Sequence, residues 1–325
     1  MKRLIYIVAL ALGVTAGCQK DGVRGDDQME CVKMRVEIPQ EAQTKAVSEG
    51  NLVDVVYYEV WSADFKSKLH SNSADVRGCK AEIDVALVKD QTYTMVFWAQ
   101  KKSVTDGFQS PFYWSDLKRV NVNYSKFTQN NKDWYDAFYC VETVIADGKE
   151  KTVRLYRPFA QLNFGTSTLS TAFGEFSIDS NTVTVSQLAT AFDTEHGYAY
   201  ADSYVSNVTI SANAGGLVQQ ENEDRKDLEV GGETYYWVAM NYLLVPSQDK
   251  ATVKVDLTFN TSGGSLSHSL ENVPIKKNYR TNIVGDLFTS STHLQIVVDP
   301  NFKKPDINSP DFDLPTEDDN TTNNN

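Results

Sequence analysis

The stretch that decides the fold is Arg157-Pro-Phe-Ala-Gln-Leu-Asn-Phe-Gly165, close to the middle of the 325-residue chain. The apolar residues before it fall on odd positions up to Leu155, whereas those within it fall on even positions from Ala160. A strand with a period of two cannot change face without a bulge, a bend or a move to another sheet. Pro158 also lacks the N–H that a central strand requires. We therefore expect this stretch to join two β-rich halves of the chain.

Length and composition favour a folded, acidic protein. A chain of 325 residues can form two domains with cores of their own, and 41% hydrophobic and 11% aromatic residues exclude a wholly disordered chain. The net charge is −12, without a Lys/Arg cluster in the part expected to fold. Because such a chain repels phosphate backbones, we expect no nucleic-acid partner.

The N-terminus has the pattern of an export signal. Lys2 and Arg3 precede an apolar run over 4–14 that is too short to span a bilayer, and Thr15-Ala-Gly-Cys18 follows. Residues 1–17 are therefore predicted to be a signal peptide. The small residues before Cys18 resemble the bacterial lipobox, which implies acylation of Cys18 and anchoring to outer-membrane lipid. The alternative is an ordinary signal peptide with an incidental cysteine.

Three cysteines remain if Cys18 is lipidated, namely Cys31, Cys79 and Cys140. An odd number cannot form a complete disulfide framework. One disulfide with a spare thiol and three thiols both remain open.

The first half has the rhythm of a β-sandwich. After a polar leash over 18–30, an amphipathic first strand is predicted from four alternating apolar residues, Val32, Met34, Val36 and Ile38. Further strands are expected within 52–61, 83–87, 93–99, 137–145 and 151–156. Asp147-Gly148 lies between the last two and predicts a hairpin there. We assign residues 31–157 to this sandwich.

The second half repeats the rhythm. Strand-like runs separated by glycine-rich turns cover 173–178, 182–185, 205–210, 234–239, 252–259 and 293–298, which predicts a second antiparallel sandwich over 158–302. Residues 303–325 contain three prolines, an acidic excess and an Asn-rich end, so we expect a disordered acidic tail. The predicted fold class is all-β, with two tandem sandwiches.

The sequence carries no recognisable motif for catalytic or cofactor chemistry. The four histidines are scattered without zinc-ligand spacing, and neither a nucleophile elbow nor a phosphate-binding loop is present. Asp133 and Asp136 could serve calcium, but they lack the spaced oxygen ligands of a calcium loop, and a solvated loop is the alternative. The sequence predicts a non-enzymatic protein with no metal and no cofactor. Aromatic residues at 112–114 and 134–135 could stack on sugars, with a place in the core as the alternative.

Several motifs, in order along the chain, carry a family resemblance. They are Phe97-Trp-Ala99, Asp136-Ala-Phe-Tyr139, the 157–165 stretch, the run 239–246 and the run 278–283. Together with the lipoprotein start, they resemble the fimbrillin (Mfa-like) lipoproteins of Bacteroidales over nearly the whole chain up to 302. The resemblance implies tandem transthyretin-like sandwiches, a cell-surface location, and assembly into type V pili with a role in adhesion.

The resemblance also implies a mechanism of assembly. In that family a protease cuts after a basic residue behind the first strand, and a strand from a neighbouring subunit fills the groove that is left. The removable strand would carry Val32, Met34, Val36 and Ile38. The cut would follow Lys45, with Arg24 as an alternative; Arg35 lies within the strand. The C-terminal donor strand would carry Leu294, Ile296 and Val298.

The position of the subunit within a fimbrium and one alternative function stay open at this point. The polar tail could not fill an apolar groove, so shaft, anchor, tip and accessory positions all remain possible for a fimbrial subunit. The alternative function is a monomeric surface glycan-binding lipoprotein with an exposed aromatic platform. The expected partners are membrane lipid through Cys18, other fimbrial subunits, and ligands on host or bacterial surfaces.

Overall fold

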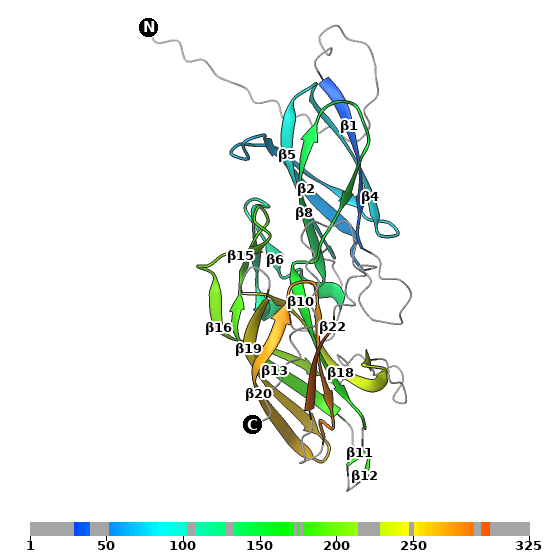
Figure 1. Ribbon diagram of the computed structural model, residues 1–325, viewed down its shortest axis with the longest axis vertical. Helices are drawn as coiled ribbons and strands as arrows, with labels where there is room; N and C mark the ends of the chain where they lie inside the picture. The colour runs from blue at the N-terminus through cyan, green and yellow to red at the C-terminus, as the bar shows by residue number, and fades with distance from the viewer. Residues whose placement is uncertain are drawn as a thin grey trace, which may run out of the picture.

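A computed structural model of the chain describes residues 29–39, 52–102, 108–127, 133–168, 170–171, 174–175, 178–213, 228–246, 250–288 and 294–299. In these ranges the regular structure is strand apart from two short 3-10 helices, η1 (Tyr124–Lys126) and η2 (Asp133–Tyr135). Figure 1 shows an elongated molecule with β1, β2, β4, β5 and β8 in its upper part and β10 to β22 in its lower part. The prediction of an all-β fold is confirmed.

The upper part contains two facing sheets. One has the order β4-β1-β9 and the other the order β3-β2-β5-β8. Alternate side chains of β4 are buried, as the period of two requires, and they share a core with the inward side chains of β1, β2 and β5. The bounds are β1 Met29–Glu37, β2 Val55–Ser62, β3 Lys68–Asp75, β4 Lys80–Val88, β5 Thr92–Gln100, β8 Ala137–Ile145 and β9 Lys151–Arg154.

The hairpin predicted at Asp147-Gly148 is wrong. A turn does form there, with Gly148 at a φ of 74°. However, β8 pairs with β5 in one sheet, whereas β9 pairs with β1 in the other. The turn therefore carries the chain from one sheet to the facing sheet, where β9 lies parallel to β1.

The lower part is a second sandwich. A five-stranded sheet has the order β17-β18-β10-β21-β22, and a four-stranded sheet has the order β16-β13-β19-β20. Every residue of β10 is buried, so the strand after the junction lies in the interior of the protein. The bounds are β10 Phe159–Thr166, β13 Ile178–Ala189, β16 Tyr204–Asn213, β17 Leu228–Val230, β18 Glu233–Leu244, β19 Lys250–Thr261, β20 Gly264–Lys276, β21 Arg280–Gly285 and β22 Leu294–Asp299; a small pair, β11 (Ser170–Thr171) and β12 (Gly174–Glu175), stands apart.

A further sheet connects the two parts. It has the order β15-β14-β7-β6, in which β6 (Phe112–Tyr113) and β7 (Arg119–Val122) precede the junction, and β14 (Ala191–Asp193) and β15 (Tyr198–Ala199) follow it. The fully buried Trp98 packs against Phe112 and Phe192, with ring centroids 5.4 and 6.3 Å apart. Aromatic packing therefore joins strands from both parts.

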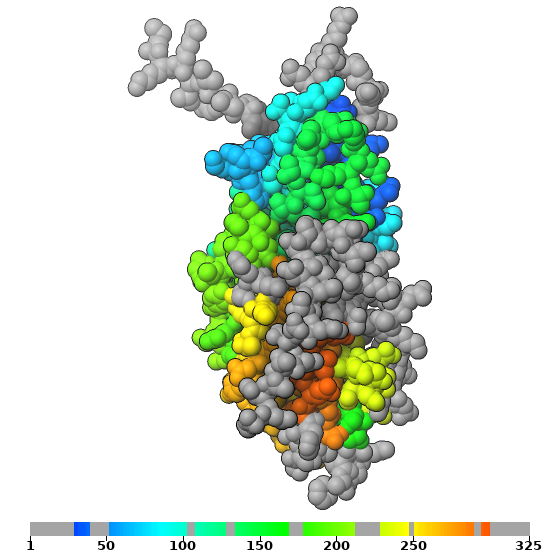
Figure 2. All heavy atoms as spheres, viewed as in Figure 1, coloured from blue at the N-terminus to red at the C-terminus, as the bar shows by residue number. Residues whose placement is uncertain are grey.

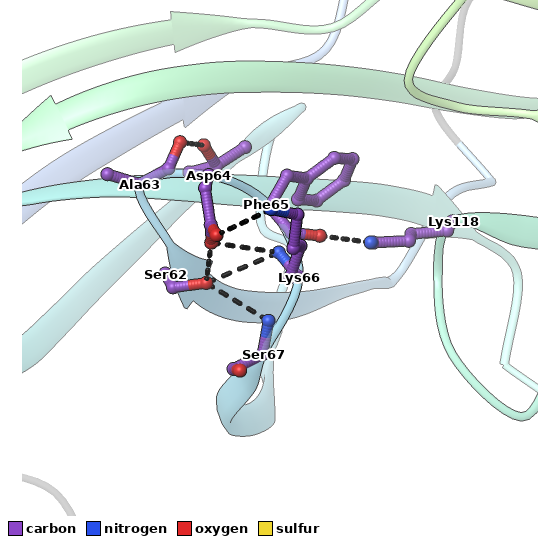
Figure 3. Close-up of polar contacts among 8 residues, drawn as sticks. Ser62, Ala63, Asp64, Phe65, Lys66, Ser67 and Lys118 are labelled. Atoms are coloured by element: carbon purple, nitrogen blue, oxygen red, sulfur yellow. Dashed lines mark hydrogen bonds and ion pairs between the residues drawn. The ribbon is translucent and has the colours of Figure 1, made fainter.

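The turn between β2 and β3 is tied to the same region (Figure 3). Ser62 and Asp64 bind the backbone N–H groups of the turn, which holds Phe65 at a φ of 58°. Lys118 donates to the carbonyl of Phe65, and its Nζ lies 4.2 Å from the ring centroid of Trp61. A cation above an aromatic ring is attracted by the ring quadrupole, so Lys118 fastens the turn to the segment before β7.

At the junction, the chain passes from the three-stranded sheet into the five-stranded sheet. This passage explains why the apolar positions change from odd to even between β9 and β10. Arg157 lies between the two strands with its guanidinium buried against the carboxylate of Asp136. Both carboxylate oxygens of Asp136 accept from Arg157, so this carboxylate is engaged in the junction.

Candidate functional site

The first strand, β1, contains the residues that the sequence marked as removable. Val32, Met34, Val36 and Ile38 are at most 3% exposed and contact the core of the upper sandwich. Just beyond the strand, the N–H of Ile38 donates to the carbonyl of Cys79 over 2.9 Å. Three apolar side chains of this nine-residue strand, together with that of Ile38 just beyond it, thus contribute to this core.

β1 is the central strand of its sheet. It pairs antiparallel with β4 along its whole length, from Met29 opposite Val88 to Glu37 opposite Lys80. It also pairs parallel with β9 from Met34 to Glu37. Withdrawal of β1 would therefore leave unpaired backbone groups on both neighbours and an open apolar groove between them. Only small patches of β1, coloured blue, reach the surface in the view of Figure 2.

The outer face of β1 carries charges whose partners lie on neighbouring segments. Arg35 pairs with Glu150 over 3.1 Å, and Glu37 lies between Lys80 and Arg154, at 3.9 Å from each. Exposed pairs of this kind contribute little to stability. However, a strand at this place has to carry charges that complement those of its neighbours. These pairs were not predicted from the sequence, in which the charged residues between the apolar positions were the available signal.

The C-terminal strand, β22, is the last strand at one edge of the five-stranded sheet. Leu294, Ile296 and Val298 lie opposite β21, and the last two are 37% and 38% exposed. An apolar row thus remains partly exposed on a strand with only one neighbour among the described strands. β22 and β1 lie in different parts of the molecule (Figure 1), so the structure does not bring these two predicted strands together within one chain.

Several predicted positions lie outside the described residues. These are the signal peptide, Cys18, Arg24, Lys45 and the tail over 303–325. Arg35, by contrast, is paired in the ladder on both sides, with Glu82 and Thr152 as its register partners. A protease needs an extended segment that it can reach, and a central strand does not provide one.

The cysteines and aromatic residues have mostly structural surroundings. Cys31, Cys79 and Cys140 form no disulfide with one another. Burial raises the pKa of the Cys140 thiol to about 12, which keeps it protonated. Of the aromatic candidates, Phe112 and Tyr135 are buried, Trp114 and Trp134 are half-buried, and Tyr113 is exposed.

The described ranges contain neither a metal-ligand cluster nor a membrane-spanning helix. Within them, no group of His, Cys, Asp and Glu side chains is arranged to hold a metal ion. None of the helices in the same ranges has the length and apolar character needed to cross a bilayer.

Comparison with known proteins gives a family and a fold. The sequence pattern of DUF6562, a family of unknown function, matches residues 26–323. No curated protein matches the chain. A solved candidate cell adhesion protein from Bacteroides ovatus is 10% identical, with a TM-score of 0.50 over 82% of this chain and 96% of that one.

Two further solved structures have lower TM-scores. A fimbrial assembly protein from Parabacteroides distasonis is 13% identical, with a TM-score of 0.40 over 83% of this chain and 95% of that one. The tip fimbrial protein Mfa3 from Porphyromonas gingivalis, with a C-terminal truncation, is 11% identical, with a TM-score of 0.41 over 83% and 99%. The resemblance to adhesion and fimbrial proteins of Bacteroidales is confirmed at the level of the fold.

Proposed function

This chain belongs to DUF6562, a family of unknown function, and we propose that it is a non-enzymatic, cell-surface fimbrial or adhesion subunit that assembles by strand exchange at β1. The observation that carries the proposal is the central place of β1, whose removal opens a groove between β4 and β9. The family motifs in the sequence and the similarity in fold to a candidate cell adhesion protein support the same role.

Energetics explain why such a groove would have to be refilled. A buried side chain of this size contributes roughly 1.5–3 kcal/mol by leaving water. Four of them together are comparable with the whole stability of a typical domain, about 5–15 kcal/mol. A subunit without β1 would therefore bind a replacement strand or lose its upper sandwich.

The replacement that we propose is β22 of a second copy. If this strand runs in the same direction as β1, its apolar residues would occupy the positions of three apolar residues of β1: Leu294 that of Val32, Ile296 that of Met34 and Val298 that of Val36. Asp299 would then take the place of Glu37 between Lys80 and Arg154. In the opposite direction, His293 would stand beside these two cations without a countercharge. Charge complementarity therefore favours the direction of β1.

The match with β22 is incomplete at one end. Pro300 would occupy the position of Ile38, and proline has no N–H to donate to the carbonyl of Cys79. β22 has six residues in its strand, whereas β1 has nine. A strand from another subunit with an apolar residue at the fourth position would bind more tightly, so the position of this subunit in a fimbrium depends on its partners.

The finer parts of the proposal come from the sequence. Residues 1–17 would direct export, acylated Cys18 would hold the precursor on the outer membrane, and the sandwiches would divide between 157 and 158. Cleavage would follow Lys45, with Arg24 as the alternative. Since Arg35 is paired on both sides within the sheet, a cut there is disfavoured.

A peptide-exchange experiment tests the groove and the donor. After cleavage of the precursor, a peptide with the sequence of residues 293–301 should bind the cleaved protein and not the intact precursor. The same peptide with Asp299→Lys should bind several-fold more weakly, because a lysine would stand beside Lys80 and Arg154. Peptide binding to the intact precursor, or equal binding of both peptides to the cleaved protein, would contradict the proposed register.

One observation favours the alternative, a surface glycan-binding protein. Tyr113 is 58% exposed, and the half-buried Trp114 next to it packs on Tyr57 with ring centroids 5.1 Å apart. Exposed aromatic rings of this kind stack on sugars. Glycan binding by the intact precursor that is lost in Tyr113→Ala would support this function, whereas strand exchange would be unaffected by the substitution.

A further inference from the structure

The five-stranded sheet of the lower sandwich carries a group of buried polar side chains, three of them amides, which we call the amide cluster. It consists of Gln161, Asn163, Tyr242, Asn282 and Trp237. Asn163 donates to Asn282 over 2.8 Å and to Gln161 over 3.2 Å, and Gln161 donates to the hydroxyl of Tyr242 over 3.2 Å. All five side chains are at most 1% exposed.

The amide cluster lies on the sheet face that points away from the core between the two sheets. Register pairs place Gln161 opposite Tyr242 and Asn163 opposite Asn282, so these side chains share one face. The other face holds Leu162 and its partner Thr281, which donates to the carbonyl of Pro274 in the four-stranded sheet. The amide cluster therefore lies on the outer face, and yet it is buried.

Three polar atoms of the amide cluster have no hydrogen-bond partner among the residues that the structure describes. They are Asn163 Oδ1, Asn282 Nδ2 and Trp237 Nε1, which are one acceptor and two donors. A buried polar atom without a partner costs about 1–3 kcal/mol, and native proteins leave few of them. Because all three groups are uncharged, they suit a ligand with both carbonyl and N–H groups. A peptide backbone has this chemistry.

We propose that the occupant is the C-terminal segment of the same chain, residues 300–325. β22 ends at Asp299 on the edge of this sheet, and its register partner Arg280 stands in the row of Gln161. The segment therefore starts beside the amide cluster. From β22 to β18 is three strand spacings, about 14 Å, which roughly five extended residues can span.

The composition of the segment matches the outer face. Pro305, Pro310 and Pro315 favour the polyproline II conformation, which has no internal hydrogen bonds and exposes its carbonyl groups. Such segments dock on aromatic-lined surfaces with polar donors, which Trp237 and Tyr242 provide here. Arg280 adds a positive charge on the same face, opposite an acidic segment. A polar tail that cannot fill an apolar groove thus finds a polar site within its own subunit.

Calorimetry on a truncated chain tests this docking. A chain that ends at Asp299 should bind a synthetic peptide of residues 300–325 with one-to-one stoichiometry, and the full chain should not bind it because its own segment occupies the site. In the truncated chain, Trp237→Phe removes the indole N–H and keeps an aromatic ring, and it should weaken peptide binding about five- to tenfold. Thr184→Ala, on the outer face of the four-stranded sheet, is the matched control and should leave binding unchanged.

Hydrogen exchange in the full chain gives a second test that does not depend on truncation. Asn163→Ala and Asn282→Ala should each increase the exchange of amides in residues 300–325, whereas Thr184→Ala should not. Three results would overturn the proposal: no peptide binding by the folded truncated chain, equal binding by the truncated and full chains, or exchange in 300–325 that is the same in all three variants. A different segment, or none, would then cover the amide cluster.

Discussion

The guanidinium of Arg157 binds the carboxylate of Asp136 through two hydrogen bonds of 2.7 and 2.8 Å, and each side chain is 2% exposed. The guanidinium also lies 4.8 Å from the ring centroid of Phe138. A paired, bidentate geometry of this kind is what allows two charges to remain buried. The pair joins the start of β8 to the junction that leads into β10, so it fixes the connection between the two sandwiches.

Removal of one member of this pair should strongly destabilise the protein. Arg157→Met leaves the carboxylate of Asp136 buried without a countercharge, and we expect a loss of about 3–5 kcal/mol in the free energy of unfolding. Urea denaturation measures the loss. Arg154→Met, which removes an exposed cation 3.9 Å from Glu37, should cost less than about 1 kcal/mol. Equal losses in the two variants would contradict the role of the buried pair.

The two faces of β1 should respond differently to truncation. Met34→Ala removes a side chain that is 2% exposed and should lower the free energy of unfolding by about 2–5 kcal/mol. Lys33→Ala, on the exposed face of the same strand, should change it by less than about 0.5 kcal/mol. Thermal or urea unfolding of the uncleaved precursor distinguishes them. A small effect of Met34→Ala would mean that β1 contributes little to the core.

The hydroxyl of Tyr124 should stabilise the lower sandwich. It accepts from the N–H of Leu244 over 3.0 Å and donates to the carbonyl of Ala189 over 3.1 Å, so it connects both sheets. Tyr124→Phe leaves these buried groups without that partner and should cost about 1–3 kcal/mol in urea denaturation. Tyr113→Phe removes an exposed hydroxyl and should have no measurable effect. The reverse order would show that the hydroxyl of Tyr124 has no structural role.

Stability should fall in alkali because of Cys140. Burial raises the pKa of its thiol from 9.0 to about 12, so between these values the unfolded state loses a proton that the folded state keeps. The free energy of unfolding should therefore decrease above pH 9, by up to about 1.4 kcal/mol per pH unit from this group. Urea denaturation at pH 8 and pH 10 should show a smaller decrease for Cys140→Ala than for the unmodified chain. An identical decrease in both would refute the assignment.

The local alternation of apolar and polar residues is sufficient to predict the buried side chains of a strand when its other face is exposed to solvent. The alternation in β1 and β4 predicts inward side chains correctly, because β1 exposes Lys33 and Arg35 on its other face. In β10 the same reasoning fails: Gln161 and Asn163 occupy the polar positions, yet both are buried. A strand that is covered on both faces cannot be recognised from a period of two, because the cover comes from distant parts of the chain.

Turn signals also have a limited range. Asp147-Gly148 does form a turn, but a turn does not determine which sheet the next strand joins. β9 lies parallel to β1, a strand from the beginning of the chain, and that pairing decides its place. The pairing of Asp136 with Arg157 is hidden for the same reason, since the two residues lie on either side of β8 and β9. The proposed strand-exchange role of β1 follows only from the family resemblance, because the partners of its charged residues lie on segments that local sequence patterns do not identify.

The most direct test of the account is the state of the protein after β1 has been cut free. The purified precursor is treated with a trypsin-like protease, and its mass is followed by light scattering while mass spectrometry locates the cut. We predict cleavage behind β1, loss of the fragment that carries Val32 to Ile38, and assembly into oligomers in which β4 and β9 regain hydrogen-exchange protection. A cleaved protein that loses β1, stays monomeric and folded, and takes up no complementary strand would contradict the central claim.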